Sequence, residues 1–143
     1  MAGDYGDAYS RTGAEWADAV AAARAYLIEQ SQLCRTTSYT ELNAVLGQRT
    51  DVRAFDFGLD AERAAMGHLL GLVVAADRPT SGVMLSALVV YLNENDAGSG
   101  FYALATQLGV LPRGATADEK LEFWAAEVER VQAHYPRRRR NAL

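Results

Sequence analysis

The sequence is poor in residues that cross-link a chain. It contains 1 cysteine and 2 histidines among 143 residues. Cys34 therefore has no partner for an internal disulfide, and metal-type cysteine spacing is absent. We expect a reducing compartment. We expect Cys34 to be buried as a small apolar side chain, with a free thiol near Arg35 as the alternative.

Long hydrophobic runs are also missing. Apolar stretches such as residues 69–76 fall far short of the ~18–20 residues that a membrane span needs. Residues 1–7 are acidic and lack the basic and apolar regions of a secretory signal. We therefore expect no membrane partner and a cytoplasmic location.

What is present is the composition of an ordinary folded domain. Apolar residues make up 50% of the chain and charged residues 22%, which excludes disorder as a description of the whole. The length suits one domain with its own core. We expect a flexible N-terminus over residues 1–12 that adds little to that core, a single globular domain over 13–136 and a basic tail over 137–143.

The charge is unevenly distributed along the chain. The formal net charge is −4, but four consecutive arginines stand near the end: Arg137, Arg138, Arg139 and Arg140. The rest holds 10 basic against 18 acidic residues. Such a body is not a broad clamp for nucleic acid, because phosphate binding normally requires basic residues clustered on one face. The tail is the local exception, and a solvated tail without a partner is the alternative.

Hydrophobic periodicity predicts four helices. They cover residues 13–33, 40–46, 60–76 and 117–134. Ser38 or Thr40 can cap the second helix, and Thr116 with Glu119 forms a capping box for the last one. Gly47 is expected to end the second helix, and Pro79 to end the third near residue 76.

Two segments are predicted to be strands. Residues 83–92 are an almost continuous apolar run, and residues 101–104 can return as its partner in a hairpin with its tip at 93–100. A short extended segment precedes the second helix, and residues 48–59 form a loop. The predicted class is α/β, mostly α: a winged-helix-like core with a β-hairpin, packed against N- and C-terminal helices.

Several short motifs carry a resemblance to a known family. They are Thr37-Ser38-Tyr39-Thr40-Glu41-Leu42, Ala65-Met66-Gly67, Pro79 and Leu85-Ser86-Ala87-Leu88-Val89-Val90. Over residues 37–92 the chain resembles the winged-helix DNA-binding domain of the O6-alkylguanine alkyltransferases and alkyltransferase-like proteins. The resemblance implies that Tyr39 and Arg63 are DNA-contact residues, with Arg63 one position before the place of the family's arginine.

The departures from the family limit what the resemblance implies. Ser86 and Ala87 stand where the family has its Cys-His pair. Without a thiolate and its activating histidine, alkyl transfer is not expected. The loop over residues 48–59 is also longer than the family's.

No other set of residues makes a coherent catalytic or metal site. Ser86 needs a base, and the histidines, His68 and His134, are interpreted as a packed residue at a helix edge and a helix-end residue. Asp56, Asp60 and Glu62 match no cation-binding loop and are interpreted as a solvated loop and an acidic helix start. We expect no enzyme activity, no cofactor and no metal.

The sequence thus predicts a non-enzymatic binding protein that recognises nucleic acid or a nucleoprotein complex. The predicted nucleic-acid-binding residues are Tyr39, Arg63, Arg137, Arg138, Arg139 and Arg140. The alternative is a protein-interaction accessory or inhibitor module that sets its acidic body against a basic protein. The apolar stripe of the last helix also suggests a homodimer through that helix.

Overall fold

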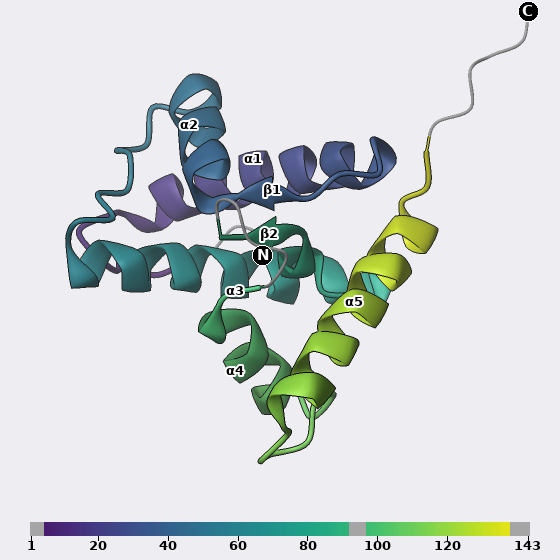
Figure 1. The fold of residues 1–143 in the computed structure, drawn as a ribbon. Helices are drawn as coiled ribbons and strands as arrows, with labels where there is room; N and C mark the ends of the chain where they lie inside the picture. The colour runs from purple at the N-terminus through teal and green to yellow at the C-terminus, as the bar shows by residue number, and fades with distance from the viewer. Residues whose placement is uncertain (1–4, 92–96, 138–143) are drawn as a thin grey trace, which may run out of the picture.

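The computed structural model describes residues 5–91 and 97–137 (Figure 1). Within these ranges the helices are α1 Gly13–Gln32, α2 Tyr39–Arg49, α3 Asp60–Ser81, α4 Ser99–Gln107 and α5 Ala117–His134. The 3-10 helix η1 Leu85–Leu88 leads into strand β2 Val89–Val90, which pairs in parallel with β1 Thr37–Ser38. The predicted class, α/β and mostly α, is confirmed. In the described ranges, no helix is both long and apolar enough to cross a bilayer.

Side chains before three of the helices explain where those helices begin. The hydroxyls of Thr12, Ser38 and Thr116 accept a hydrogen bond from the backbone N–H three residues on, and the glutamate there bonds back to the cap. This capping box satisfies backbone donors that an exposed helix start leaves free. The cap at Ser38 and the capping box at Thr116 confirm the sequence predictions.

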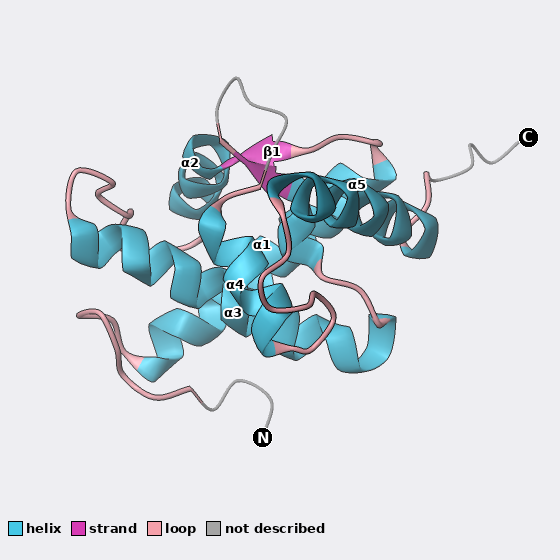
Figure 2. Cartoon of the chain, turned by 60° about the horizontal axis from the view of Figure 1, so that its bottom comes forward, coloured by secondary structure: helices cyan, strands magenta, loops and turns pink. Residues whose placement is uncertain are grey.

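The core lies where α1 and α3 pack together and η1 packs on both. Trp16, Leu27, Leu69, Val73 and Leu88 are fully or almost fully buried there. Figure 2 shows the strand pair as a small patch between α2 and α5, above the two long helices. The α1 and α3 helices thus form the platform on which the other elements are placed.

Polar anchors hold α5 against η1. Glu127 accepts a hydrogen bond from the backbone N–H of Met84 at 2.8 Å, and the Trp124 indole donates to the carbonyl of Ala87 at 2.8 Å. At the end of the helix, the Tyr135 hydroxyl donates to the buried carboxylate of Asp77 at 2.6 Å. These bonds fix the C-terminal helix to the η1 segment and to α3.

The N-terminal segment contributes more to the interior than the sequence predicted. Arg11 is 2% exposed and forms a two-pronged ion pair with Glu62, with both N–O distances at 2.9 Å. The Trp16 indole donates to the carbonyl of Ala8. For the described residues 5–12, the prediction of little contribution to the core was wrong, because a buried arginine finds its carboxylate on α3.

Two predicted helix ends were wrong. The α2 helix continues through Gly47 to Arg49 and ends at Thr50, whose backbone N–H and hydroxyl both donate to the carbonyl of Leu46. The α3 helix contains Pro79 and ends at Gly82, which adopts the left-handed conformation (φ 72°). Pro79 lies in the last turn, where its missing N–H removes a single helical hydrogen bond.

The predicted strand over residues 83–92 was also wrong for most of its length. Residues 83–90 are buried and Tyr91 is exposed, but the run forms η1 and only a two-residue strand. The Glu127 carboxylate accepts a hydrogen bond from the backbone N–H of Met84, and the Trp124 indole donates one to the carbonyl of Ala87. The run is apolar because it is buried, not because it is a long strand. Side chains of α5 supply some of the backbone hydrogen bonds that a neighbouring strand would have supplied.

The predicted hairpin was wrong as well. Residues 101–104 lie inside α4. The β2 strand pairs with the distant β1, and the chain returns to it only through a single antiparallel bridge between Val90 and Ala97 in the described residues. Phe101 and Ala105, one helical turn apart, are buried, and the Phe101 ring lies 5.8 Å from that of Phe123. Of the predicted tip, residues 93–96 lie outside the described ranges, while Ser99 and Gly100 begin α4.

Candidate functional site

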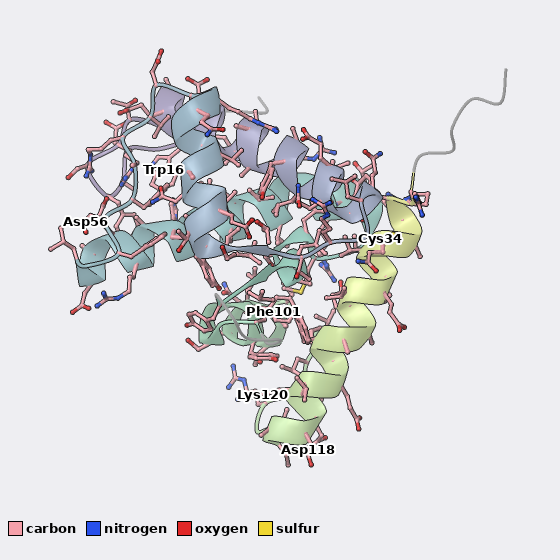
Figure 3. The ribbon with its side chains drawn as sticks, turned by 45° about the horizontal axis from the view of Figure 1, so that its top comes forward. Trp16, Cys34, Asp56, Phe101, Asp118 and Lys120 are labelled. Atoms are coloured by element: carbon pink, nitrogen blue, oxygen red, sulfur yellow. The ribbon has the colours of Figure 1, made fainter. Side chains whose placement is uncertain are left out.

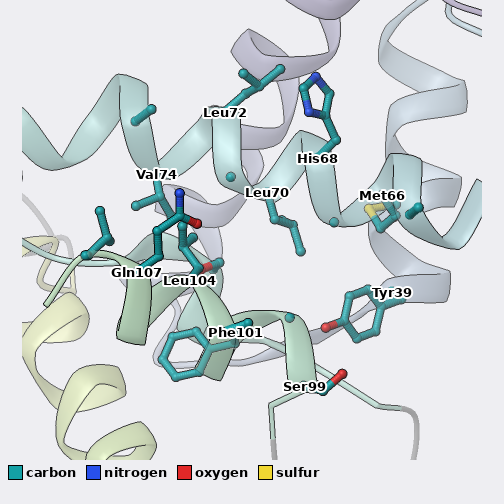
Figure 4. Close-up of a pocket in the computed structure, with 18 of the residues that line it drawn as sticks. Tyr39, Met66, His68, Leu70, Leu72, Val74, Ser99, Phe101, Leu104 and Gln107 are labelled. Atoms are coloured by element: carbon teal, nitrogen blue, oxygen red, sulfur yellow. The ribbon is translucent and has the colours of Figure 1, made fainter. Parts of the chain in front are cut away.

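A groove between α3 and α4 is the candidate site (Figure 4). Its volume is about 1750 Å³. The α3 helix supplies one side, and α4 supplies another. Residues from the start of α2, from η1 and from the end of β2 complete the lining. The groove therefore lies where segments distant in the sequence meet.

Small residues keep the α3 side of the groove bare. Gly67, Gly71 and Ala75 follow one another at helical spacing and line the groove, so they share one face of α3. A Cβ atom built on Gly67 or Gly71 meets nothing within 4 Å. The opposite face of α3 carries Leu69 and Val73 into the core. The glycines therefore leave the groove face of α3 without side chains, while the opposite face of the same helix packs in the core.

Two tyrosines stand at one end of the groove, called here the tyrosine end. The rings of Tyr39 and Tyr91 are 5.4 Å apart, and Tyr39 is half-buried whereas Tyr91 is exposed. A Cβ on Gly98 would lie 2.6 Å from the Tyr39 hydroxyl oxygen, so a larger residue there would displace the Tyr39 side chain. Burial, with a smaller contribution from Tyr91, raises the pKa of Tyr39 to about 12. The phenol is therefore a neutral hydrogen-bonding group at physiological pH.

Arg63, in the first turn of α3, also lines the groove. Its guanidinium pairs with Asp60 and donates to the carbonyl of Phe57, and its side chain remains half-exposed. Asp60 offsets part of the positive charge. The predicted contact residues Tyr39 and Arg63 are thus brought together on one groove, although they come from α2 and α3.

Ser86 lines the groove from η1. It is 3% exposed, and its Oγ has no hydrogen-bond partner among the described residues. A serine nucleophile needs a base within hydrogen-bond reach, and Oγ bonds to no histidine of the described ranges. His68 packs instead against Trp16, with ring centres 4.8 Å apart. His134 is exposed beside Tyr135.

The remaining predicted residues lie apart from the groove. Arg137 is exposed after α5, and Arg138, Arg139 and Arg140 lie outside the described residues. Cys34 is exposed, which corrects the prediction that it is buried; Figure 3 shows it in the turn after α1, near the C-terminal end of α5.

The three carboxylates considered together in the sequence, Asp56, Asp60 and Glu62, do not form one cluster in the structure. Glu62 is buried in its ion pairs with Arg11 and Arg53, whereas Asp56 and Asp60 are exposed. The Arg11 guanidinium holds the pKa of Glu62 at about 2. In the described part of the chain, no group of three or more His, Cys, Asp or Glu side chains is arranged to hold a metal.

Most arginines of the described ranges are neutralised by carboxylates. Six of them form ion pairs: Arg11, Arg24, Arg49, Arg53, Arg63 and Arg130. Arg78 is half-buried, has no ion pair among the described residues and lines the groove. Neither this residue nor the groove was predicted from the sequence, because α4 was expected to be a strand. The helical spacing of Gly67, Gly71 and Ala75 was the available signal.

Comparison of the chain with protein-family profiles, with curated proteins and with solved structures finds no match. The candidate function therefore rests on the geometry of the groove and on the residues that line it.

Proposed function

We propose that this chain is a non-enzymatic nucleic-acid-binding protein that contacts its target at the tyrosine end of the groove. The observation that carries the proposal is the meeting of Tyr39, Arg63 and Ser86 on one groove. These residues come from α2, α3 and η1. The alkyltransferase resemblance implies a DNA contact at Tyr39, places Arg63 one position before the family's arginine, and places Ser86 where the family has its Cys-His pair.

The chemistry of the tyrosine end suits a nucleobase. Tyrosine rings stack on bases, and an unpaired base stacked on an aromatic side chain gains ~1–3 kcal/mol. The two rings offer faces at a groove that also presents a guanidinium, and guanidinium groups bind phosphate or the acceptor edge of guanine. We infer that an unpaired or displaced base enters here, while the duplex or strand runs outside.

The arrangement of α1, α2 and α3 supports a winged-helix-like centre. The α2 and α3 helices follow the short strand β1, as the second and third helices of a helix-turn-helix do. In that interpretation α3 is the recognition helix, and Arg63 stands in its first turn, where such helices contact DNA. The predicted hairpin, whose tip at 93–100 would be the wing, is not part of this support, because residues 101–104 are helical.

Charge limits the binding to local contacts. The body is acidic, and Arg49, Arg53 and Arg63 are paired with Glu29, Glu62 and Asp60. In this proposal the phosphate contribution comes from Arg63 and from the arginines at 137–140. Affinity is therefore expected to be modest and strongly dependent on salt.

Fluorescence anisotropy tests the proposal. A labelled single strand and a duplex of about 20 nucleotides, longer than a typical single-strand site, are titrated at about 50 mM and 200 mM salt. We expect binding that weakens with salt. The variant Arg63→Gln should weaken it, and glutamines at 137–140 should reduce the salt slope on duplex DNA by about 0.9 for each phosphate that is no longer neutralised.

The matched control is Arg113→Gln. Arg113 is exposed, forms no ion pair among the described residues and does not line the groove. Its variant removes the same charge and should bind like the parent protein. Absence of binding to either probe at low salt would refute the proposal. Equal effects of Arg63→Gln and Arg113→Gln would mean that nucleic acid does not bind at the groove.

One observation favours the alternative of a protein-interaction module. On α5, Asp118, Glu122 and Glu129 are exposed and form no ion pair within the described ranges. This acidic helix would suit a basic protein surface. A stoichiometric protein partner that resists nuclease treatment and no longer binds when these carboxylates are replaced by amides would support it over nucleic-acid binding.

A further inference from the structure

The half of the groove between α4 and the end of α3, called here the arginine end, has a chemistry of its own. It combines apolar walls with an arginine that has no ion pair among the described residues, and the groove lining also holds a buried hydroxyl without a hydrogen-bond partner there. We infer that the arginine end binds a small amphipathic carboxylate, an anionic head on an elongated apolar body. This inference does not depend on nucleic-acid binding at the tyrosine end.

Arg78 supplies the charge for such a head. It stands in the last turn of α3 and is half-buried beside the groove, with no ion pair among the described residues. Nearby C-terminal carbonyls favour a cation there, but they do not use the planar fork of donors that a guanidinium offers to a carboxylate. Since Arg63 is paired with Asp60, Arg78 is the arginine of the groove lining whose pairing capacity is unused within the described ranges.

Ser86 supplies a second polar group on the lining of the same groove. The chain leaves α3 at Gly82 and reaches Ser86 in η1, and both residues line the groove together with Arg78. A buried hydroxyl without a partner reduces stability until something bonds to it. A carboxylate has two oxygens and about four lone pairs, so one head group can accept from both Arg78 and Ser86.

The walls suit an apolar body rather than a second polar group. Leu70, Val74 and Leu104 line the groove, and Figure 4 shows Leu70 directed from α3 into the space before α4. The bare face of α3 at Gly67 and Gly71 continues it away from Arg78. From Arg78 to Gly67 the helix rises ~16 Å. The space along α3 is therefore elongated and largely apolar, with Arg78 at one end, which matches a medium-chain carboxylate lying along α3.

The shielding of Ser86 favours a small molecule over a protein helix. Its Oγ is buried beneath the groove surface, so a thin, flexible head group reaches it after a rotation of the serine side chain. A helix laid along the groove would cover the bare face of α3 without reaching that depth. The experiment must therefore distinguish binding of a small carboxylate from binding of an acidic peptide.

Isothermal titration calorimetry with decanoate tests the inference. Decyltrimethylammonium, which has the same chain and the opposite charge, serves as the matched ligand. We expect one decanoate per chain and at least tenfold weaker binding of the cation. Inorganic phosphate and a short glutamate-rich peptide are titrated as alternative anions, and both should bind at least tenfold more weakly than decanoate.

Three variants locate the site. Arg78→Gln should weaken decanoate binding at least tenfold. Gly71→Leu should abolish binding by filling open space, and its fold should survive because nothing lies within 4 Å of the new Cβ. Ser86→Ala should weaken binding severalfold and yet raise the melting temperature, because it removes an unpaired buried hydroxyl. A purely structural role of Ser86 would not produce these opposite effects.

Arg113→Gln is again the control and should bind decanoate as the parent chain does. Circular dichroism checks that each variant is folded. The inference is overturned if Gly71→Leu binds decanoate like the parent chain, or if Arg78→Gln and Arg113→Gln behave alike. Tighter binding of phosphate or of the peptide, abolished in Arg78→Gln, would assign Arg78 to that ligand and would also overturn it.

Discussion

The buried ion pair between Arg11 and Glu62 should make a large contribution to stability. The two side chains are 0% and 7% exposed and meet through two N–O contacts of 2.9 Å. The Arg11 guanidinium also lies over the Phe55 ring, 4.1 Å from its centre. This cluster joins the N-terminal segment to the first turn of α3, next to Arg63 and the tyrosine end of the groove.

The magnitude follows from the pKa of Glu62. Arg11 lowers that pKa from 4.5 to about 2, and each unit corresponds to ~1.4 kcal/mol, so the ionised form contributes roughly 3 kcal/mol at most. The pKa is depressed in the folded state. The contribution is therefore complete above pH 4.5 and is lost as the pH falls from 4.5 to about 2.

The perturbation is Glu62→Gln. It removes the charge and leaves Arg11 buried without a carboxylate, which costs about 3–5 kcal/mol. Urea unfolding followed by tryptophan fluorescence measures this cost, since Trp16 lies beside Arg11. Between pH 4.5 and about 2 the difference in unfolding free energy between parent and variant should shrink. Asp118→Asn, at an exposed position on α5, is the control and should change stability little.

A small effect of Glu62→Gln would refute this explanation. The variant would have to lower the free energy of unfolding by less than about 1 kcal/mol at neutral pH, because a buried guanidinium without its partner is costlier than that. A difference between parent and variant that stayed constant from about pH 5 to about pH 2 would refute it too. That result would mean that Glu62 does not keep its charge through the pair.

Three further predictions concern other contacts. Burial raises the pKa of Tyr39 from 10.0 to about 12, so Tyr39 should ionise at a higher pH than a free phenol. The free energy of unfolding should fall as the pH rises from 10.0 to about 12. Absorbance titration of Tyr39→Phe should show one phenol fewer in that pH range. Asp77→Ala should destabilise the chain by about 3 kcal/mol or more in urea, because it strands Arg24 and Tyr135, whereas Ser81→Ala removes a hydrogen bond to Asp77 and should cost about 1 kcal/mol. Trp124→Phe should cost about 1–3 kcal/mol by leaving the carbonyl of Ala87 unpaired, measured as a lower urea midpoint at unchanged slope.

Local chemistry made much of the helical fold predictable. The caps at Ser38 and Thr116, each followed three residues later by glutamate, specify helix starts without help from distant residues. The periodicity of α1 and α5 likewise depends on neighbours within the helix. These elements were predicted with nearly the observed bounds.

The segment after α3 could not be predicted in the same way. Met84 and Ala87 find their backbone partners on α5, some forty residues along the chain, and no local pattern announces such a contact. The α4 helix was missed for a related reason. Turn-forming residues before Phe101 suggested a hairpin, whereas Phe101 and Ala105 are buried on one helical face.

The candidate site was predictable only in pieces. Tyr39 and Arg63 were selected through a family resemblance, and the structure brings them to one groove with Ser86. Arg78 has no sequence feature that separates it from the paired arginines. Arg78 has no carboxylate partner among the described residues. This becomes evident only in the packed structure, where Arg24, Arg63 and Arg130 form ion pairs with carboxylates.

The claim that nucleic acid meets the protein at the tyrosine end of the groove is tested most directly by NMR. Backbone amide resonances of the labelled full chain are followed while a short single-stranded oligonucleotide is added. We predict the largest shifts at Thr40, Gly67 and Gly100, which line the groove from three different elements. Shifts confined to α5, or an unchanged spectrum at low salt, would contradict the proposal.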